Sequence, residues 1–297
     1  MKRMFARSLF SIICLNQQII PSSTLKASLT QETSPALDHF NRATEFVKMD
    51  DLNTAIFLYS EAIKFDPSFI KAYLQRGWCQ YLKKNYSGAI EDYTQTLLYA
   101  PKNAVAYNNR GMAYFAQKNF NEAIEDLTKS INLDSNNADF YANRGLVHIA
   151  KGSQQRARRD FHRGIKDCSQ AIKINPSFLS AYLNRGSAYY AINDLENAIM
   201  DFTKAIDLDP ENYKAYHRRG RAYLSKVFLS ENIDKPRPQI FDTPPPTSVD
   251  KPPSPSDLSY RLPLPNPRNN DSVWIKKANE DFDKARELRA KNANEEK

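Results

Sequence analysis

The sequence offers few residues of the kinds that carry out catalysis. It contains four histidines and eight glycines, and it lacks the short motifs that cradle nucleotide phosphates, activate a serine or hold a catalytic zinc ion. Its three cysteines, Cys14, Cys79 and Cys168, are too few and too scattered for a disulfide framework or a zinc site. We therefore expect a protein that is not an enzyme and that uses no metal ion or other cofactor.

The residues that do recur at a fixed spacing are amides, arginines and aspartates. The segment Lys71-Ala-Tyr-Leu-Gln-Arg-Gly77 returns in similar form 34 residues later, ending at Gly111, and again after another 34, ending at Gly145. It returns twice more, ending at Gly186 and Gly220. A period of about 20 to 50 residues marks stacked repeats, so the chain is predicted to consist of copies of one unit.

Each unit is expected to be a pair of short antiparallel helices. Apolar residues recur at helical spacing in both halves of the unit, for example around Ala89-Ile-Glu-Asp-Tyr93 in the second half. Prolines such as Pro67, Pro101 and Pro210 close several units. Proline ends a helix because it lacks a backbone donor and restricts the residue before it.

This pattern resembles the tetratricopeptide repeat family, and the resemblance covers about two thirds of the chain. The family places small residues at the eighth, twentieth and twenty-seventh positions, where its helices cross closely. Gly186, Ala198 and Ala205 hold these positions in the fifth unit. The resemblance implies an all-α fold, a right-handed solenoid of about six helix-turn-helix repeats. The first helices of such a solenoid line a concave surface that binds extended peptides or partner helices.

The repeats divide the chain into five predicted segments. Residues 1–35 form an N-terminal targeting or disordered arm, and residues 36–225 hold five repeats and the first helix of a sixth. A proline-rich linker, residues 226–272, interrupts the sixth repeat, because its many prolines exclude a helix. Residues 273–290 supply the capping second helix, and residues 291–297 a polar tail. The fourth unit is seven residues too long, and the excess near residues 153–159 is expected where its helices turn.

The N-terminal arm does not decide between the possible cellular compartments. It is basic and has no acidic residue before Glu32, as in a mitochondrial presequence, but its apolar run from Leu9 to Leu15 is typical of a secretory signal. A cytoplasmic protein with a disordered tail is the remaining alternative. The apolar run is too short to span a bilayer, so no transmembrane segment is expected. Ile13 precedes Cys14, where a lipoprotein signal needs a small residue, so lipidation is not expected.

The resemblance places the candidate ligand-binding residues on the first helix of each unit. At the sixth position of that helix, an asparagine can bond the backbone of a bound chain, because an amide both donates and accepts. Apolar residues at the ninth position could receive large ligand side chains. The alternatives are solvation for the amides and packing between repeats for the apolar residues. The sixth-position residues are Asn41, Gln75, Asn109, Asn143, Asn184 and Arg218, and the ninth-position residues are Trp78, Met112 and Leu146.

A sharper hypothesis is the carboxylate clamp with which some members of this family hold acidic chaperone tails. Asn184 matches the middle repeat of the clamp, and Lys214 with Arg218 match the third. Ala142 and Leu146 stand where the first repeat needs Lys and Asn. The clamp is therefore incomplete, and a co-chaperone-like adaptor is an alternative function.

Arginine and aspartate each recur at one fixed position of the repeat unit. With a net charge of +8, the regular arginines could indicate nucleic-acid binding. We instead predict structural ion pairs, because the aspartates recur at the twenty-third position of the same units. An RNA-associated repeat protein stays an alternative, with Arg156, Arg158, Arg159 and Arg163 as its basic patch. The seventh-position arginines are Arg42, Arg76, Arg110, Arg144, Arg185 and Arg219, and the aspartates are Asp92, Asp126, Asp167, Asp201 and Asp281.

The sequence thus predicts a non-enzymatic interaction scaffold or adaptor that binds an extended peptide or a partner protein in the concave groove. Nucleic acid is not the expected partner. An assembly factor in an organelle or envelope is a further alternative. The sequence does not fix the oligomeric state.

Overall fold

The computed structural model describes residues 34–231 and 271–295, and within these two ranges the chain forms α-helices and no strand. The all-α fold predicted from the sequence is confirmed. The arm at residues 1–33, most of the predicted linker and the last two residues lie outside the described residues. The helices are α2 (Pro35–Lys48), α3 (Leu52–Phe65), α4 (Ile70–Leu82), α5 (Tyr86–Tyr99), α6 (Ala104–Ala116), α7 (Phe120–Leu133), α8 (Ala138–Gln155), α9 (Arg158–Ile174), α10 (Leu179–Ala191), α11 (Leu195–Leu208), α12 (Tyr213–Glu231) and α13 (Asp271–Glu295).

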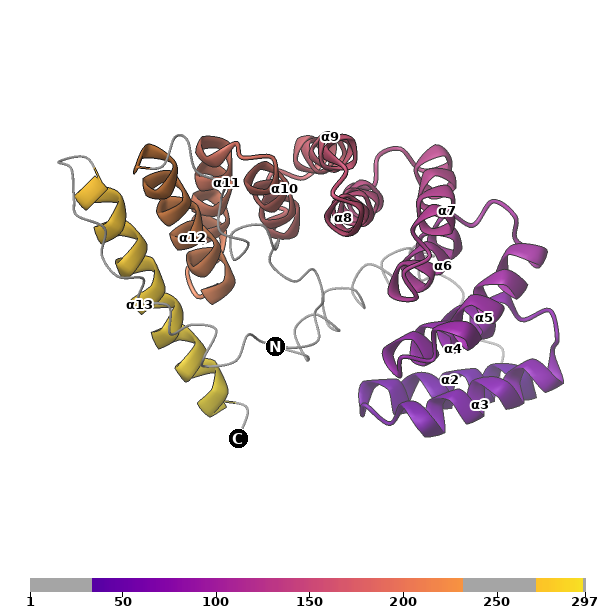
Figure 1. The fold of residues 1–297 in the computed structure, drawn as a ribbon. Coiled ribbons are helices and arrows are strands. Elements are labelled where there is room, and N and C mark those ends of the chain that lie inside the picture. Colours follow the sequence, from indigo (N-terminus) through magenta and orange to yellow (C-terminus); the bar gives the residue numbers. More distant parts are fainter. Residues whose placement is uncertain (1–33, 232–270, 296–297) are drawn as a thin grey trace, which may run out of the picture. The chain divides into compact units, whose positions relative to one another are not determined.

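The helices pack as six consecutive pairs, from α2 with α3 to α12 with α13 (Figure 1). The second helix of each pair also contacts the first helix of the next pair. From α4 to α12, the first helices contact one another as well, whereas no two second helices in the described ranges make comparable contacts. The first helices therefore form the inner side of the stack, and we call this side the A face.

The turn between the two helices of a pair has the same two features in most repeats: a residue in the left-handed backbone conformation and a side chain that caps the second helix. Lys84 and Lys118 have φ angles of 64° and 65°, in the left-handed region that reverses the chain sharply. An asparagine or aspartate then begins the second helix. Asn85 Oδ1, for example, accepts a hydrogen bond from the backbone amide of Gly88 at 3.3 Å, which satisfies one of the unpaired donors at the helix start.

Small residues set how closely the two helices of a pair cross. A Cβ added to Gly111 would lie 2.9 Å from Leu127 Cγ and 3.1 Å from the Ala123 carbonyl oxygen. Ala123 itself is completely buried. The glycine at the eighth position is therefore required by the close approach of the second helix, as the sequence pattern predicts.

The turn of the fourth pair lies within the expected residues 153–159, and the extra residues on either side of it lengthen the two helices. Helices α8 and α9 have 18 and 17 residues, against 13 and 14 in most other pairs. The turn is reduced to Arg156, with φ 53°, and Ala157. The added helix turns pack closely on each other, because Gly152 is buried and a Cβ added to it would lie 3.2 Å from the Ala157 carbonyl oxygen.

The sixth pair joins helices from the two sides of residues 232–270. Helix α12 runs to Glu231, six residues beyond the predicted boundary at residue 225, because Val227 is buried and the Ser225 hydroxyl lies 2.9 Å from that of Tyr190. Helix α13 packs on α12, with the Trp274 ring stacked on Tyr223 at 5.4 Å. In the described part of the chain, no helix is long and apolar enough to cross a bilayer.

Candidate functional site

A repeated ion pair ties the arginine of each first helix to the aspartate of its second helix. Arg110 donates from Nε and Nη2 to the two carboxylate oxygens of Asp126, at 2.7 and 3.0 Å. Its Nη1 donates to Thr94 Oγ1 of the preceding pair at 3.0 Å. One guanidinium therefore holds three helices together. The same arrangement occurs in the sets Ser60, Arg76 and Asp92; Thr128, Arg144 and Asp167; Ser169, Arg185 and Asp201; and Thr203, Arg219 and Asp281.

These five arginines have a structural role, as the sequence predicted. The side chain of Asp126 is only 5% exposed, and bidentate bonding to Arg110 compensates its carboxylate for the loss of water. Arg42 is the exception, because Leu58 replaces the aspartate in the first pair. Its side chain is 57% exposed and lies 3.8 Å from Asp38. Sequence reasoning missed the hydroxyl partners, although a serine or threonine recurs sixteen residues before each paired arginine.

Three amides form a hydrogen-bonded chain between α6 and α8 on the A face. Asn143 Nδ2 donates to Asn108 Oδ1 at 2.9 Å, and Asn108 Nδ2 donates to Asn109 Oδ1 at 3.0 Å. We call this chain the amide cluster. Asn108 is buried, and the sequence analysis did not single it out. Asn109 and Asn143 are half-buried. Within the described residues, Asn109 Nδ2 and Asn143 Oδ1 have no hydrogen-bond partner, so one donor and one acceptor are available to a ligand.

The other predicted sixth-position residues are not brought into this cluster. Asn41 is exposed on α2, while Gln75 on α4 and Asn184 on α10 are half-buried. Arg218 on α12 reaches back to α10, where its Nη1 donates to the Leu183 carbonyl oxygen at 3.3 Å and to Ser187 Oγ at 3.2 Å.

The three predicted ninth-position residues differ in their surroundings. Trp78 is half-buried and stacks on Tyr81, with ring centroids 5.6 Å apart. Met112 packs against the buried cluster of Ala123, Leu127 and Val147, and so takes part in packing between repeats. Leu146 is half-buried on α8. Trp78 with Tyr81 is therefore the most distinct apolar feature among them.

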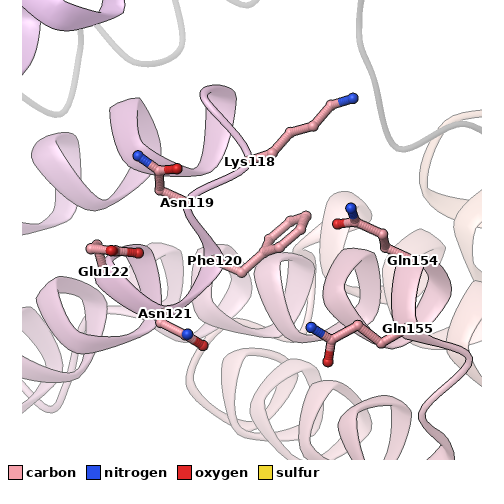
Figure 2. Close-up of a pocket in the computed structure, with 7 residues that line it drawn as sticks. All are labelled: Lys118, Asn119, Phe120, Asn121, Glu122, Gln154 and Gln155. Carbon is pink, nitrogen blue, oxygen red and sulfur yellow. The ribbon is translucent and has the colours of Figure 1, made fainter.

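The lengthened fourth pair also creates a surface hollow of about 290 Å³ (Figure 2). It lies between the α6–α7 turn and the end of α8, where Lys151 Nζ bonds Asn121 Oδ1 at 2.8 Å. Its lining is mostly polar and holds no nucleophile beside a base. It consists of Lys118, Asn119, Phe120, Asn121, Glu122, Gln154 and Gln155.

The two described cysteines are buried among the helices. Burial raises the pKa of the Cys79 thiol to about 12 and also raises that of Cys168. A thiol held protonated is a poor nucleophile and a poor metal ligand. In the ranges that the structure covers, no group of three or more His, Cys, Asp or Glu side chains could hold a metal ion.

The repeats match known family models. Tetratricopeptide repeat models match residues 71–103, 104–137 and 180–212, which lie on three of the helix pairs described above. The chain is a tetratricopeptide repeat protein. A comparison with curated proteins found no match to this tetratricopeptide repeat protein.

Solved structures share its fold. MamA is 25% identical with a TM-score of 0.52, and the match covers 61% of this chain and 95% of MamA. YrrB, described as a TPR protein with an unusual peptide-binding site, is 20% identical with a TM-score of 0.50, covering 63% of this chain and 92% of YrrB. PilF of Pseudomonas aeruginosa is 18% identical with a TM-score of 0.55, covering 67% and 86%. The family match and the likeness to MamA support a protein-interaction scaffold.

Proposed function

We propose that this tetratricopeptide repeat protein is a non-enzymatic scaffold that binds an extended segment of a partner protein along its A face. The amide cluster carries this proposal. Asn108 fixes the orientation of Asn109 and Asn143, which leaves a donor and an acceptor on adjacent first helices. A peptide backbone presents the complementary acceptor and donor whatever its side chains are, so this pair of groups suits a chain bound in extended form.

The remaining predicted site residues extend the surface in both directions from the amide cluster. Asn41, Gln75 and Asn184 offer further amides, and Leu146 lies on the same helix as Asn143. Trp78, stacked on Tyr81, offers an apolar surface at one end. Burying such a surface contributes about 25 cal/mol per Å², so the scaffold is expected to favour ligands with large apolar side chains there.

The test begins with peptides selected from a random displayed library on the immobilised full-length chain. The dissociation constant of the best peptide is then compared between the wild type and Asn109→Ala with Asn143→Ala. Because two backbone hydrogen bonds are lost, affinity should fall about ten-fold, with helicity retained in circular dichroism. The matched control is Asn132→Ala with Asn136→Ala, two exposed amides on and after α7. Unchanged affinity in the first variant, or an equal loss in the control, would contradict the proposal.

An adaptor for acidic C-terminal tails stays a second candidate. Lys214 is exposed on α12, as a clamp residue must be. Ala142, however, is buried and apolar where the clamp needs a lysine, and Arg218 is bonded to α10. A free acidic C-terminal peptide that binds, paired with an amidated peptide that does not, would favour this candidate over internal-segment binding.

A further inference from the structure

The hollow beside the fourth pair has a lining that suits a flat polar ring. The Phe120 ring lies between the side chains of Lys118 and Gln154 (Figure 2). Phe120 is only half-buried, because it packs against the buried Leu127 and also lines the hollow. An aromatic face stacks on a nucleobase, and amides can donate to and accept from its edges. The other polar side chains of the lining are Asn119, Asn121, Glu122 and Gln155.

Exposed arginines lie next to this hollow, in the turn between α8 and α9. Arg156, Arg158 and Arg159 follow directly after Gln155, and we call these three residues the arginine tip. Among residues 34–231 and 271–295, no carboxylate pairs with them, whereas Arg163 is paired with Asp160 at 3.2 Å. Positive side chains at the start of a helix are unfavourable, because that end of the helix dipole is positive. A bound anion would remove this cost.

The two second helices that begin beside the hollow also lack a side-chain cap. Helices α3, α5 and α11 begin with Asp51, Asn85 and Asp194, and each of these side chains accepts a bond from a backbone amide. Asn119 at the start of α7 and Ala157 at the start of α9 make no such bond. The first turns of α7 and α9 therefore keep backbone donors of the kind that bind phosphate oxygens.

We propose that the hollow and the arginine tip form a binding site for single-stranded nucleic acid. One base lies on Phe120 among the amides, and the phosphates beside it are held by the arginine tip and the uncapped helix starts. Three unpaired arginines side by side suit a strand with several phosphates better than a free nucleotide with one. The inference does not rest on the proposed function, because these residues belong to the turns within pairs and not to the A face. The five arginines of the repeated ion pairs take no part, because their aspartates already hold them.

Other anionic partners fit this site less well. A lipid surface usually takes up large apolar side chains, whereas residues 153–159 hold only Ser, Gln, Arg and Ala. An acidic protein segment could pair with the arginines but would leave the aromatic face of Phe120 unused. A nucleic-acid duplex keeps its bases stacked inside, so it could not place one in the hollow.

The experiment uses the full-length chain and fluorescein-labelled strands of eight nucleotides and mixed sequence, made as RNA and as DNA. Fluorescence anisotropy at low salt measures their dissociation constants. At least one of the two strands should bind about ten-fold or more tighter than an abasic strand with the same phosphates, because the abasic strand cannot stack on Phe120. It should also bind more tightly than its own duplex, and the tighter of the RNA and DNA strands identifies the ligand. Equal affinity for the abasic strand, or no binding of either normal strand, would overturn the proposal.

Variants then test the two parts of the site. Arg158→Gln with Arg159→Gln should weaken strand binding about ten-fold and flatten its dependence on salt. Lys173→Gln with Lys204→Gln removes the same charge from exposed positions of α9 and α11 and should keep the affinity. Equal losses in these two variants would mean attraction to net charge alone and would overturn the proposal.

Phe120→Leu should remove the preference for the normal over the abasic strand. Because Phe120 also packs on the core, Gln154→Ala with Gln155→Ala changes only exposed side chains and should reduce the same preference. A preference that survives in Phe120→Leu, or in the glutamine variant should Phe120→Leu fail to fold, would overturn the proposal. Asn109→Ala with Asn143→Ala should keep strand binding, and a loss as large as in the arginine variant would place the strand on the A face instead.

Two competitors define the class of ligand. Hexaglutamate carries negative charge without bases, and a mixture of the four nucleoside monophosphates carries bases with one phosphate each. Each should displace the labelled strand only at concentrations about ten-fold or more above that of the unlabelled strand. Displacement by either competitor at the concentration of the unlabelled strand would reassign the site to an acidic peptide or a free nucleotide and overturn the proposal.

Discussion

At the scale of single residues, the same side-chain type has two roles in this protein. Arg110 uses three of its nitrogens to bond Asp126 and Thr94, a geometry that the rigid fork of a guanidinium permits and a lysine does not. The Arg–Asp pair could be predicted because both residues recur in register along the sequence. The link from Asn143 to Asn108 could not, because it joins different repeats and Asn108 has no counterpart at the same position of the other units.

The first prediction concerns Arg110. Changing Arg110→Ala leaves the Asp126 carboxylate buried without its partner, so the free energy of unfolding should fall by about 1 to 3 kcal/mol. Arg42→Ala is the matched control, since Arg42 is exposed and weakly paired, and it should change stability by less than about 0.5 kcal/mol. Urea unfolding followed by circular dichroism measures both. Similar losses in the two variants would show that the paired arginine adds nothing beyond its charge.

The second prediction concerns the buried thiols. Cys79 and Cys168 are fully buried and their pKa values are raised, so a thiol reagent should reach them only after local or global opening. In a Cys14→Ser variant, labelling by Ellman's reagent at pH 8 should be slower in the native protein than in urea by roughly 100-fold or more. Rapid native labelling of either cysteine would mean that its helix crossing is looser than described.

At the scale of helices, the repeat pattern predicted most elements because it fixes both the apolar face and the small residues at each crossing. It failed where the pattern itself changes. The turn of the fourth unit lies within residues 153–159 as expected, but the sequence did not show that the extra residues on either side of it, such as the buried Gly152, lengthen the two helices. The end of α12 was placed too early, because burial of Val227 depends on tertiary contacts and not on the repeat.

The third prediction tests a crossing within this lengthened pair. A Cβ added to Gly164 would lie 3.0 Å from the Gly145 carbonyl oxygen and closer still to Ile149. Gly164→Ala should therefore destabilise the protein by about 1 to 3 kcal/mol, because two backbones must separate. Gly88→Ala on α5 meets the ends of the Gln80 and Asn85 side chains and no backbone atom, so it should destabilise the protein less than Gly164→Ala does. Thermal melts that rank the two variants in the opposite order would contradict this account.

The fourth prediction concerns α13 as the closing helix of the sixth pair. Arg219 bonds Asp281 across the segment 232–270, and Phe282 fits against Gly220. Ending the chain after residue 231 should lower the melting temperature, because α12 loses its apolar cover and Arg219 its partner. Replacing residues 235–268 by a short Gly/Ser linker should leave melting unchanged or raise it, since closure entropy grows only slowly with loop length.

Tryptophan fluorescence reads out the docking of α13 directly. In a Trp78→Phe variant, Trp274 is the single tryptophan, stacked on Tyr223 with Lys226 4.1 Å from its ring centre. Its emission should be alike in the full-length and linker-replaced chains and should shift to the red on unfolding. If the truncated chain melted like the full-length protein, α13 would not stabilise α12. The prediction that residues 226–272 interrupt a sixth repeat would then be wrong.

At the scale of the whole described stack, each helix pair contacts mainly its neighbours. Each arginine of the repeated ion pairs also bonds a serine or threonine of the preceding pair, so this bond crosses the boundary between two pairs. The sequence could predict this linear order because repetition implies it. The stability of such a stack is the sum of the stabilities of its units and of the interfaces between neighbours. The position of a substitution therefore determines which helix pairs it destabilises.

The last prediction compares the middle of the stack with its end. Arg144→Ala removes the bond to Thr128 of the preceding pair and the partner of Asp167, while Arg219→Ala removes the corresponding bonds to Thr203 and Asp281. Because the interaction between neighbouring pairs transmits cooperativity, Arg144→Ala should weaken protection from hydrogen exchange on both sides of α8. Arg219→Ala should weaken it in α12 and α13 and leave α4 to α8 near wild type. Native-state hydrogen exchange with peptide-level mass spectrometry distinguishes the two patterns. A uniform loss of protection in both variants would show that the pairs unfold as one unit, which contradicts a stack stabilised between neighbours.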